Sequence, residues 1–403
     1  MKKDKTKQGR RDFIKTGLAG IAGAAVAPSL LRAGEGEEKK ERKLINRTLG
    51  KTGLKCPIVS IGAAGQDPAL YKAAMDMGLT HFDTANSYGN GNHEVLVGEV
   101  IKGRPRDSYI ITTKVHLPMD QRTGQFIPGA ATAEAFIGAF ETSLGRLGIE
   151  YVDILHMHAL SAAAAVTYEP IVLALEKMKK EGKTRFVGVS VHTNEPEVID
   201  AAVDSKFHEV VLTSYNFRQP HVKEVKKSIA RAAKAGLGIV AMKTQAGVYW
   251  DKEREKKINM TAALKWVLRD ENVHTSIPGF SSMEQLEEDM AAMENLKFSD
   301  QEKKDLELGM LDGMQGLYCA QCRRCVDTCR HHIEIPAMMR SFMYAYGYRN
   351  LAKAKDTIRP LLAEAGKCRE CGNCTVDCTM GFDVKEKIAD IARIENVPDD
   401  FLA

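Results

Sequence analysis

The sequence lacks the glycine fingerprint G-x-G-x-x-G, which binds dinucleotides where a strand turns into a helix. Its most glycine-rich stretch, GLAGIAGAA (17–25), follows no predicted strand and has the wrong spacing. This absence argues against a doubly wound sheet that binds a dinucleotide in that way.

Other absences exclude several kinds of partner. No C-x-x-C-H motif occurs, because Arg323, Val326, Gly372 and Thr375 follow the C-x-x-C pairs, and covalent c-type haem is thereby excluded. No basic stripe is interleaved with aromatic residues, so we expect no nucleic-acid partner. The apolar stretch 18–31 is short and rich in glycine, so we expect no stable membrane span.

The positive charge of the chain is concentrated at its N-terminus. The 57 Lys/Arg and 53 Asp/Glu give a net charge of +4, and residues 1–43 alone hold 12 basic and 6 acidic residues. Within them, RRDFIK (10–15) matches the twin-arginine export signal R-R-x-F-[LI]-K. We therefore predict recognition by the twin-arginine export machinery and a periplasmic or otherwise exported location. A merely basic tail is the alternative.

The nine cysteines are distributed unevenly, because eight form two runs near the C-terminus and only Cys56 stands apart. Both runs read C-x2-C-x2-C-x3-C, the spacing that holds cubane iron–sulfur clusters in bacterial ferredoxins. The predicted cluster ligands are Cys319, Cys322, Cys325, Cys329, Cys368, Cys371, Cys374 and Cys378. Two [4Fe–4S] clusters are therefore expected.

Two other uses of these cysteines fit less well. A disulfide scaffold suits small domains that lack a core, and this chain is long. Four-coordinate zinc would leave the third cysteine of each run superfluous. In two-cluster ferredoxins the fourth cysteine ligates the other cluster, so we expect Cys378 to join the first triplet and Cys329 the second. The segment between the runs looks helical and resembles the dicluster modules of respiratory reductases.

Between residues 44 and 300, short β-branched runs alternate with amphipathic helical stretches. The eight strand candidates are 58–63, 80–85, 109–115, 151–158, 185–191, 209–215, 238–244 and 274–280. Eight such alternations in about 250 residues are typical of a TIM barrel, whose chemistry lies at the carboxyl ends of the strands. The predicted fold class is α/β: a (β/α)8 barrel followed by a small helical dicluster ferredoxin-like domain.

Four motifs along this region resemble the aldo-keto reductase superfamily. They are RTLGKTGLKCPIVSIG (47–62), HFDTANSYGNGNHEVLVGEVIKGR (81–104), ITTKV (111–115) and DILHMH (153–158). The resemblance covers 47–298 and implies a catalytic tetrad of Asp83, Tyr88, Lys114 and His158.

These four residue types suit carbonyl chemistry. Hydride addition leaves an alkoxide that needs a proton, and a tyrosine hydroxyl with its usual pKa of about 10 is a poor acid near neutrality. A neighbouring lysine ammonium lowers that pKa, and a carboxylate holds the lysine in place. A histidine at the carbonyl oxygen orients the substrate. We therefore expect Tyr88 to act as general acid/base on a small carbonyl or alcohol.

The resemblance also implies a nicotinamide dinucleotide, NAD(P)(H), bound without a Rossmann motif. Ser190 would contact its carboxamide. Its phosphates and adenosine would lie against Pro278, Gly279, Phe280, Ser281, Gln285, Glu288 and Asp289. Val191, Met242 and Gln285 replace the asparagine, aromatic and arginine usual in the family, which leaves the choice between NADP and NAD open. AMKTQAG (241–247) instead resembles the M-K-P-x-G strand of the iron–sulfur branch.

Together these features predict an exported oxidoreductase of aldo-keto reductase type. It would consist of a signal peptide and linker (1–43), a barrel (44–300) and a dicluster domain (301–403), with a redox partner protein expected for the clusters. A nicotinamide transfers two electrons as a hydride, whereas a cubane cluster transfers one electron at a time. A flavin normally mediates between the two, and the sequence shows no flavin-binding motif. Two alternatives stay open: an electron-transfer or docking protein whose barrel no longer turns over nicotinamide, or clusters that are purely structural.

Overall fold

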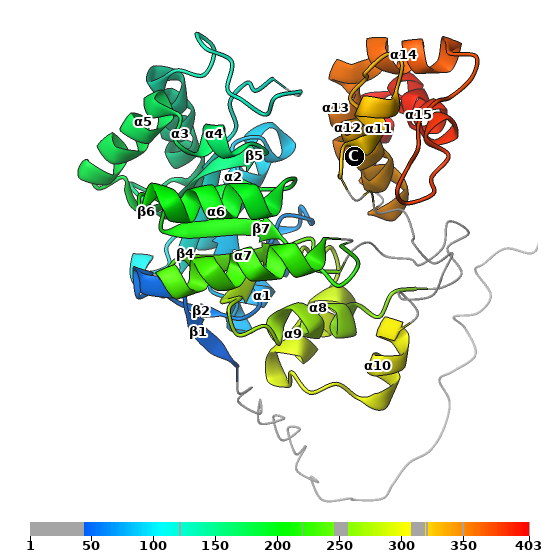
Figure 1. Ribbon diagram of the computed structural model, residues 1–403. Coiled ribbons are helices and arrows are strands. Elements are labelled where there is room, and N and C mark those ends of the chain that lie inside the picture. Colours follow the sequence, from blue (N-terminus) through cyan, green and yellow to red (C-terminus); the bar gives the residue numbers. More distant parts are fainter. Residues whose placement is uncertain are drawn as a thin grey trace, which may run out of the picture. The chain divides into compact units, whose positions relative to one another are not determined.

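The computed structural model describes residues 44–120, 122–219, 221–245, 257–307, 319, 321–348 and 350–402 (Figure 1). The predicted export signal lies outside these residues. Lys43–Ala403 form one compact unit. Within the described ranges, every helix is too short or too polar to span a bilayer.

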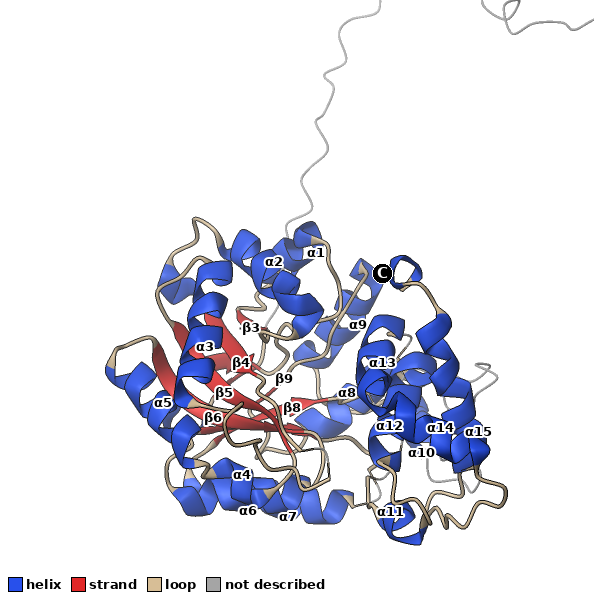
Figure 2. Cartoon of the chain, turned by 90° about the horizontal axis from the view of Figure 1, so that it is seen from above, coloured by secondary structure: helices blue, strands red, loops and turns tan. Residues whose placement is uncertain are grey.

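A parallel sheet of seven strands forms the centre of the barrel region, in the order β3-β4-β5-β6-β7-β8-β9. Its strands are β3 (His81–Asp83), β4 (Ile110–Val115), β5 (Val152–Leu160), β6 (Thr184–Val191), β7 (Val210–Ser214), β8 (Gly238–Met242) and β9 (Thr275–Ser276). Seen from above, the curled sheet lies inside a layer of helices (Figure 2). The predicted barrel fold is confirmed, with corrections to its first and last strands.

The segment expected as the first strand, 58–63, closes the ring through isolated bridges instead of a regular strand. Val59 bridges Ser276 and Ile61 bridges Phe82, both in parallel. The amide of Ile61 donates to His81 O at 2.8 Å, so the segment pairs on both sides. The expected strand 274–280 is shortened to β9, because Pro278 has no amide to donate to a ladder.

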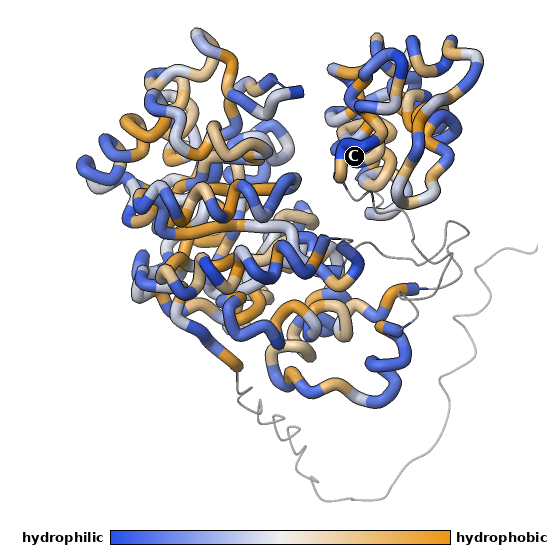
Figure 3. The backbone as a smooth tube through the Cα atoms, in the orientation of Figure 1, coloured by the Kyte–Doolittle hydropathy of each residue, from blue (hydrophilic) through white to orange (hydrophobic). Residues whose placement is uncertain are grey.

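Helices follow the strands and cover the outside of the sheet. They are α1 (Pro68–Asp76), α2 (Asn92–Ile101), α3 (Ala133–Leu147), α4 (Ala163–Val166), α5 (Glu169–Lys180), α6 (Glu195–Ser205), α7 (Val222–Ala235), α8 (Met260–Leu268), α9 (Met283–Glu294) and α10 (Asp300–Glu307). In Figure 3 the tube is mostly hydrophobic along β7 and mostly hydrophilic along α7, as expected for a buried strand under an amphipathic helix.

Local sequence signals explain where these helices begin and end. The Thr132 side chain accepts a hydrogen bond from Ala135 N at 3.1 Å and caps the start of α3. At the other end, Gly148 adopts φ +66°, a left-handed conformation that suits glycine and ends α3. The packing of α10 extends beyond the predicted domain boundary at residue 300, because Glu302 pairs with Lys265 of α8 at 2.7 Å.

A short antiparallel hairpin, β1 (Asn46–Thr48) and β2 (Lys55–Pro57), precedes the barrel. Leu49 and Cys56 of this hairpin region are fully buried in a cluster that includes Ile154 and Val210 of the sheet. Burial raises the pKa of the Cys56 thiol to about 12. Cys56 therefore packs as a small hydrophobic side chain.

The C-terminal region is helical and has its own hydrophobic core. Its helices are α11 (Arg324–Thr328), α12 (Ile335–Phe342), α13 (Leu351–Ile358), α14 (Leu362–Glu370) and α15 (Val384–Ala392). Met338, Ile358 and Ile388 are almost fully buried in this core. A π-helical turn, η5 (Met343–Gly347), continues α12. Such turns are rare and are frequently found at functional sites.

Candidate active site and cluster sites

Two side chains and one backbone carbonyl meet around the ammonium of Lys114, which is fully buried. Lys114 Nζ donates to Asp83 Oδ1 at 2.5 Å and to Thr84 O at 2.7 Å. It also donates to the Tyr88 hydroxyl at 3.3 Å. Asp83 ends β3, Lys114 lies near the end of β4, and Tyr88 begins the turn η2 (Tyr88–Gly91). Because neighbouring parallel strands end at one rim, the structure brings these residues together.

His158 lies beside this group, near the end of β5. Its ring centroid is 5.7 Å from that of Tyr88, with the planes at 78°. His158 is 6% exposed, and its Nδ1 has no hydrogen-bond partner among the described residues. The four residues expected as a tetrad therefore surround one point at the carboxyl ends of β3, β4 and β5.

Burial and charge set the protonation of these groups. Burial lowers the pKa of Lys114, but the Asp83 carboxylate and Tyr88 outweigh it and raise that pKa above its ordinary value. Burial raises the pKa of Tyr88, and the Lys114 charge offsets only part of the rise. As expected, the Lys114 ammonium lowers the Tyr88 pKa, but burial raises that pKa by more, so the net shift is upward. Burial, and then Lys114, lower the pKa of His158 well below its usual range, so the imidazole is neutral.

The turn that carries Tyr88 is fixed by a buried carboxylate. Glu94 accepts hydrogen bonds from Thr113 Oγ1 at 2.7 Å and from Arg146 Nη1 at 3.2 Å. Gly91 adopts φ +92°, and a Cβ there would meet Arg146 Cζ at 2.2 Å. Only glycine leaves room for the arginine that holds Glu94 against this turn.

A second chain of contacts links Tyr88 to the loop after β9. His93 Nδ1 is 2.8 Å from Thr84 Oγ1, and its Nε2 is 3.0 Å from the Tyr71 hydroxyl. The Tyr71 ring packs against Phe280 with centroids 5.6 Å apart. The His93 ring also meets the Tyr88 ring edge-on at 6.2 Å. The loop expected to hold a cofactor is thus connected to Tyr88.

Ser190, expected to contact the nicotinamide carboxamide, and the loop expected to hold the phosphates and adenosine already have partners. The Ser190 hydroxyl is fully buried and accepts a hydrogen bond from Ala159 N at 2.8 Å. Pro278 O accepts from Gly62 N at 2.9 Å, which ties the loop to the closing segment. A Cβ on Gly279 would lie 2.6 Å from Ala64 Cβ, so the loop packs closely there.

The remaining expected contacts lie on the loop before α9 and on α9 itself. Gln285 Oε1 accepts from Ser281 N at 2.7 Å and from Ser281 Oγ at 3.1 Å. Asp289 accepts from Gln245 Nε2 at 3.1 Å, and burial raises its pKa well above the usual value. Glu288 pairs with Lys257 at 3.7 Å. A phosphate here would compete with Gln285 for the Ser281 amide.

Two further histidines flank His158 and were missed in the sequence. The centroid of the His116 ring lies 5.8 Å from that of His158, and the centroid of the His192 ring lies 6.2 Å from it. Each directly follows a predicted strand, 109–115 or 185–191. The rule that barrel chemistry gathers at strand ends could have identified both.

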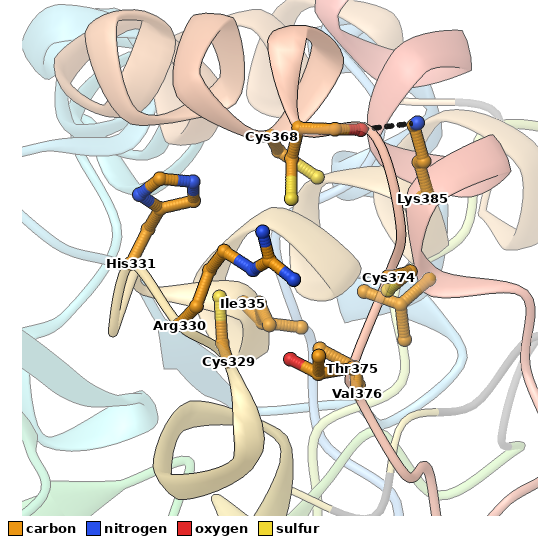
Figure 4. A pocket seen from close by; sticks show the side chains of 11 residues that line it. Cys329, Arg330, His331, Ile335, Cys368, Cys374, Thr375, Val376 and Lys385 are labelled. Atoms are coloured by element: carbon orange, nitrogen blue, oxygen red, sulfur yellow. Dashed lines mark hydrogen bonds between the residues drawn. The ribbon is translucent and has the colours of Figure 1, made fainter.

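The eight cysteines of the C-terminal region fall into two groups. Burial raises the pKa of Cys325 to about 12, and the neighbouring thiols of Cys319, Cys322 and Cys378 raise it further. The second group lines one cavity, shown in Figure 4, and consists of Cys329, Cys368, Cys371 and Cys374. This grouping is the one expected from cross-ligation, while ligation itself stays a prediction.

The donor chemistry of both groups fits iron–sulfur clusters. Four thiols per group match the four ligands that a cubane takes. Lys385 Nζ donates to Cys371 O at 2.5 Å and lines the cavity of the second group with Arg330 (Figure 4). Cations beside a cluster offset the negative charge of its thiolates. Among the described residues, no group of three or more ligating side chains is arranged to hold a single metal ion.

Sequence comparison finds two family matches. The aldo/keto reductase family matches residues 66–262, and the 4Fe-4S dicluster domain matches residues 318–383. An L-galactose dehydrogenase of Arabidopsis thaliana is 28% identical over 296 residues, which cover 63% of this chain and 90% of that protein. An L-glyceraldehyde 3-phosphate reductase of Escherichia coli O157:H7 is 27% identical over 335 residues, covering 68% of this chain and 94% of that protein.

Solved structures show the same fold. An aldo-keto reductase from Klebsiella pneumoniae in complex with NADPH superposes with a TM-score of 0.51 at 24% identity. The match covers 66% of this chain and 95% of that chain. The likeness supports the barrel architecture described above.

Proposed function

Because the chain is an oxidoreductase with an aldo/keto reductase domain and a C-terminal 4Fe-4S dicluster domain, we propose that its barrel interconverts a small carbonyl and an alcohol. Tyr88 acts as the general acid/base. The observation that carries this proposal is the buried Lys114 ammonium, which bonds to both the Asp83 carboxylate and the Tyr88 hydroxyl.

Each residue has a distinct role in this reaction. A bound nicotinamide dinucleotide supplies or accepts the hydride. Tyr88, which is protonated at neutral pH like an ordinary tyrosine and whose raised pKa extends that state to higher pH, donates its proton to the carbonyl oxygen. Lys114 orients the hydroxyl and stabilises the phenolate that remains, while Asp83 fixes Lys114. Neutral His158 donates a hydrogen bond to the same oxygen and orients it.

The cofactor would lie between this group and the loop after β9. Ser190 and the segment 278–285 are its expected contacts. The NADPH bound to the structure from Klebsiella pneumoniae supports a nicotinamide cofactor here as well. The chain has no arginine at Gln285, so we propose that it does not require the 2′-phosphate of NADP.

We also propose that the two cysteine groups hold [4Fe–4S] clusters that exchange electrons with a redox partner protein. Such clusters supply one-electron carriers. The match to the dicluster domain and the two separate groups of four thiols support this part of the proposal.

The test is anaerobic turnover of the full chain with NADPH or NADH and a panel of small aldehydes and ketones. We expect carbonyl-dependent oxidation of the nicotinamide, reduced at least 100-fold in Tyr88→Phe. Tyr109→Phe is the control, because Tyr109 is a buried tyrosine of the same barrel that precedes β4, away from the carboxyl ends of the strands. A wild-type chain that binds neither nicotinamide would contradict the enzyme and favour an electron-transfer or docking role. Clusters that cannot be reduced would favour a structural role.

We propose export by the twin-arginine route, on the basis of RRDFIK (10–15). Cell fractionation tests it: the wild-type chain should reach the periplasm, and a double Arg10→Lys, Arg11→Lys variant should stay inside. Equal distribution of the two would show that the N-terminus is merely a basic tail.

A further inference from the structure

Positive side chains gather at the carboxyl end of the barrel without a role in the reaction above. Lys243 directly follows β8 and adopts φ +55°, an unusual conformation for a lysine. Its Nζ lies 5.3 Å from the ring centroid of Tyr344. Tyr344 belongs to the π-helical turn η5, so the dicluster domain contributes directly to the rim of the barrel.

Two more cations come from the dicluster domain, Arg340 of α12 and Lys353 of α13. Burial raises the pKa of Tyr344, but Lys243, Arg340 and Lys353 together outweigh it and lower that pKa. Burial lowers the pKa of His192 most, and the same three cations lower it further. They therefore lie close enough to act on the group of histidines beside Tyr88.

Among the described residues, these cations have no carboxylate within ion-pair distance, although Arg340 also acts on the Cys319 thiol. No ion pair within the described part of the chain includes Lys243, Arg340 or Lys353. The carboxylate of Glu195 does act on Lys243. Glu195 is already bonded to His221 at 2.9 Å and to Gln219 at 3.1 Å, however, and so is engaged elsewhere. An excess of positive charge that is partly removed from water calls for an anion.

Unpartnered polar atoms lie on both sides of this contact. From the barrel, Nδ1 of His158 and Nδ1 of His192 are buried without a hydrogen-bond partner among the described residues. From the dicluster domain, Nε of Arg340 and the hydroxyl of Tyr348 are buried in the same way. The Tyr348 ring lies 6.2 Å from that of Tyr344. Buried polar groups normally have partners, and an oxyanion accepts hydrogen bonds from such groups.

We propose that Lys243, Arg340 and Lys353 form an anion site, shared by the two domains, that binds the carboxylate or phosphate of a carbonyl substrate. This inference rests on the proposed function, since the anion places the carbonyl beside Tyr88 and His158. The site differs from the proposed catalytic group because its charges lie directly after β8 and on α12 and α13. The substrate class is therefore a carbonyl compound that carries an oxyanion, and the dicluster domain helps to select it.

The kinetic test compares substrates that differ by one charged group, using the anaerobic full chain. The pairs are pyruvate with methyl pyruvate, and glyceraldehyde 3-phosphate with glyceraldehyde. We expect higher kcat/KM for the charged member of at least one pair, and which pair shows it identifies carboxylate or phosphate. Lys243→Met and Lys353→Met should each lower that preference about tenfold, mainly through KM. Lys227→Met, on the exposed face of α7, is the matched control.

Direct binding separates this inference from the proposed function. Calorimetry with pyruvate or inorganic phosphate should show binding to the wild-type chain and to the Tyr88→Phe variant. The Lys243→Met, Lys353→Met double variant should bind neither anion. Anions that bind the double variant as tightly as the wild type, or no binding at all, would overturn the anion site. If the wild-type chain binds these anions but turns over none of the carbonyl compounds, only the proposed reaction would be contradicted.

Discussion

The hydroxyl of Ser190 accepts a hydrogen bond from the amide of Ala159, the residue that directly follows His158, at 2.8 Å. The pairing of β5 with β6 shifts register between Met157 and Leu160, and Ala159 adopts φ +61°. Irregularities of this kind redirect side chains near active sites. Ser190, expected to contact a nicotinamide, therefore also holds the backbone that directs His158.

The first prediction concerns this hydrogen bond. Ser190→Ala should destabilise the chain by about 1 kcal/mol and lower kcat, because the amide of Ala159 loses its partner and His158 turns. Ser214→Ala is the matched control, since the buried Ser214 Oγ has no partner among the described residues. Urea denaturation and steady-state kinetics measure both effects. If both variants lose the same stability and the same kcat, Ser190 does not hold the backbone that directs His158.

The second prediction concerns the buried ion pair of Lys114 and Asp83. Lys114→Met should destabilise the chain by about 3–5 kcal/mol, because it leaves the Asp83 carboxylate buried and unpaired. The double variant Lys114→Met, Asp83→Leu should recover most of that stability and none of the activity. Denaturation midpoints and turnover distinguish the two outcomes. A single variant as stable as the wild type would show that the pair is not charged.

The third prediction concerns the pH dependence of turnover. Because burial raises the Tyr88 pKa, carbonyl reduction should stay constant from pH 6 to pH 9 and decline only in stronger base. Burial also keeps His158 neutral, so no change is expected near pH 6.5. Alcohol oxidation, which needs the phenolate, should increase with pH instead. An inflection near pH 7 in kcat/KM would show that another group controls proton transfer.

The fourth prediction concerns stability and the pair of His221 with Glu195. The hydrogen bond to Glu195 raises the His221 pKa above its unfolded value of about 6.5. A raised folded-state pKa stabilises the fold fully below the unfolded pKa, and this contribution disappears as the pH rises through the folded pKa. His221→Gln should therefore lose more stability at pH 5.5 than at pH 8.5. Urea midpoints at the two pH values measure the difference, and an equal loss would exclude a charged His221.

The fifth prediction tests which cysteines share a cluster. Cys329→Ser with Cys368→Ser should impair one cluster, because both cysteines line the cavity in Figure 4. Cys329→Ser with Cys325→Ser should impair both clusters. Iron analysis should then find about four iron atoms per chain in the first variant and close to none in the second. The opposite result would indicate that each run holds its own cluster.

The sequence predicts the barrel and the proximity of the four expected tetrad residues well, because both depend on local signals. Strand periodicity places Asp83, Lys114 and His158 at strand ends, and parallel pairing then brings them together. The first strand is less regular than expected, because its pairing depends on β9, which Pro278 shortens. The sign of the Tyr88 pKa shift was not predictable, since it depends on how completely the side chain is buried.

The contribution of the dicluster domain to the barrel rim had no signal in the sequence. Tyr344 and Lys353 lie in a helical segment between two cysteine runs, and such residues are usually solvated. Their proximity to Lys243 follows from the packing of helices that are distant in sequence. Periodicity and motif spacing describe single elements and their immediate neighbours, and they carry no information on contacts of this kind.

The closing segment of the barrel also determines when the chain can fold. Ser60 Oγ and Thr275 Oγ1 are 2.7 Å apart although 215 residues separate them. During synthesis the ring therefore stays open until residue 276 has left the ribosome, and contacts of such long range form slowly. Until then the growing chain exposes the unpaired edges of the segment 58–63 and of β8, which can pair with other chains. The nascent barrel is thus vulnerable to aggregation for most of its time on the ribosome.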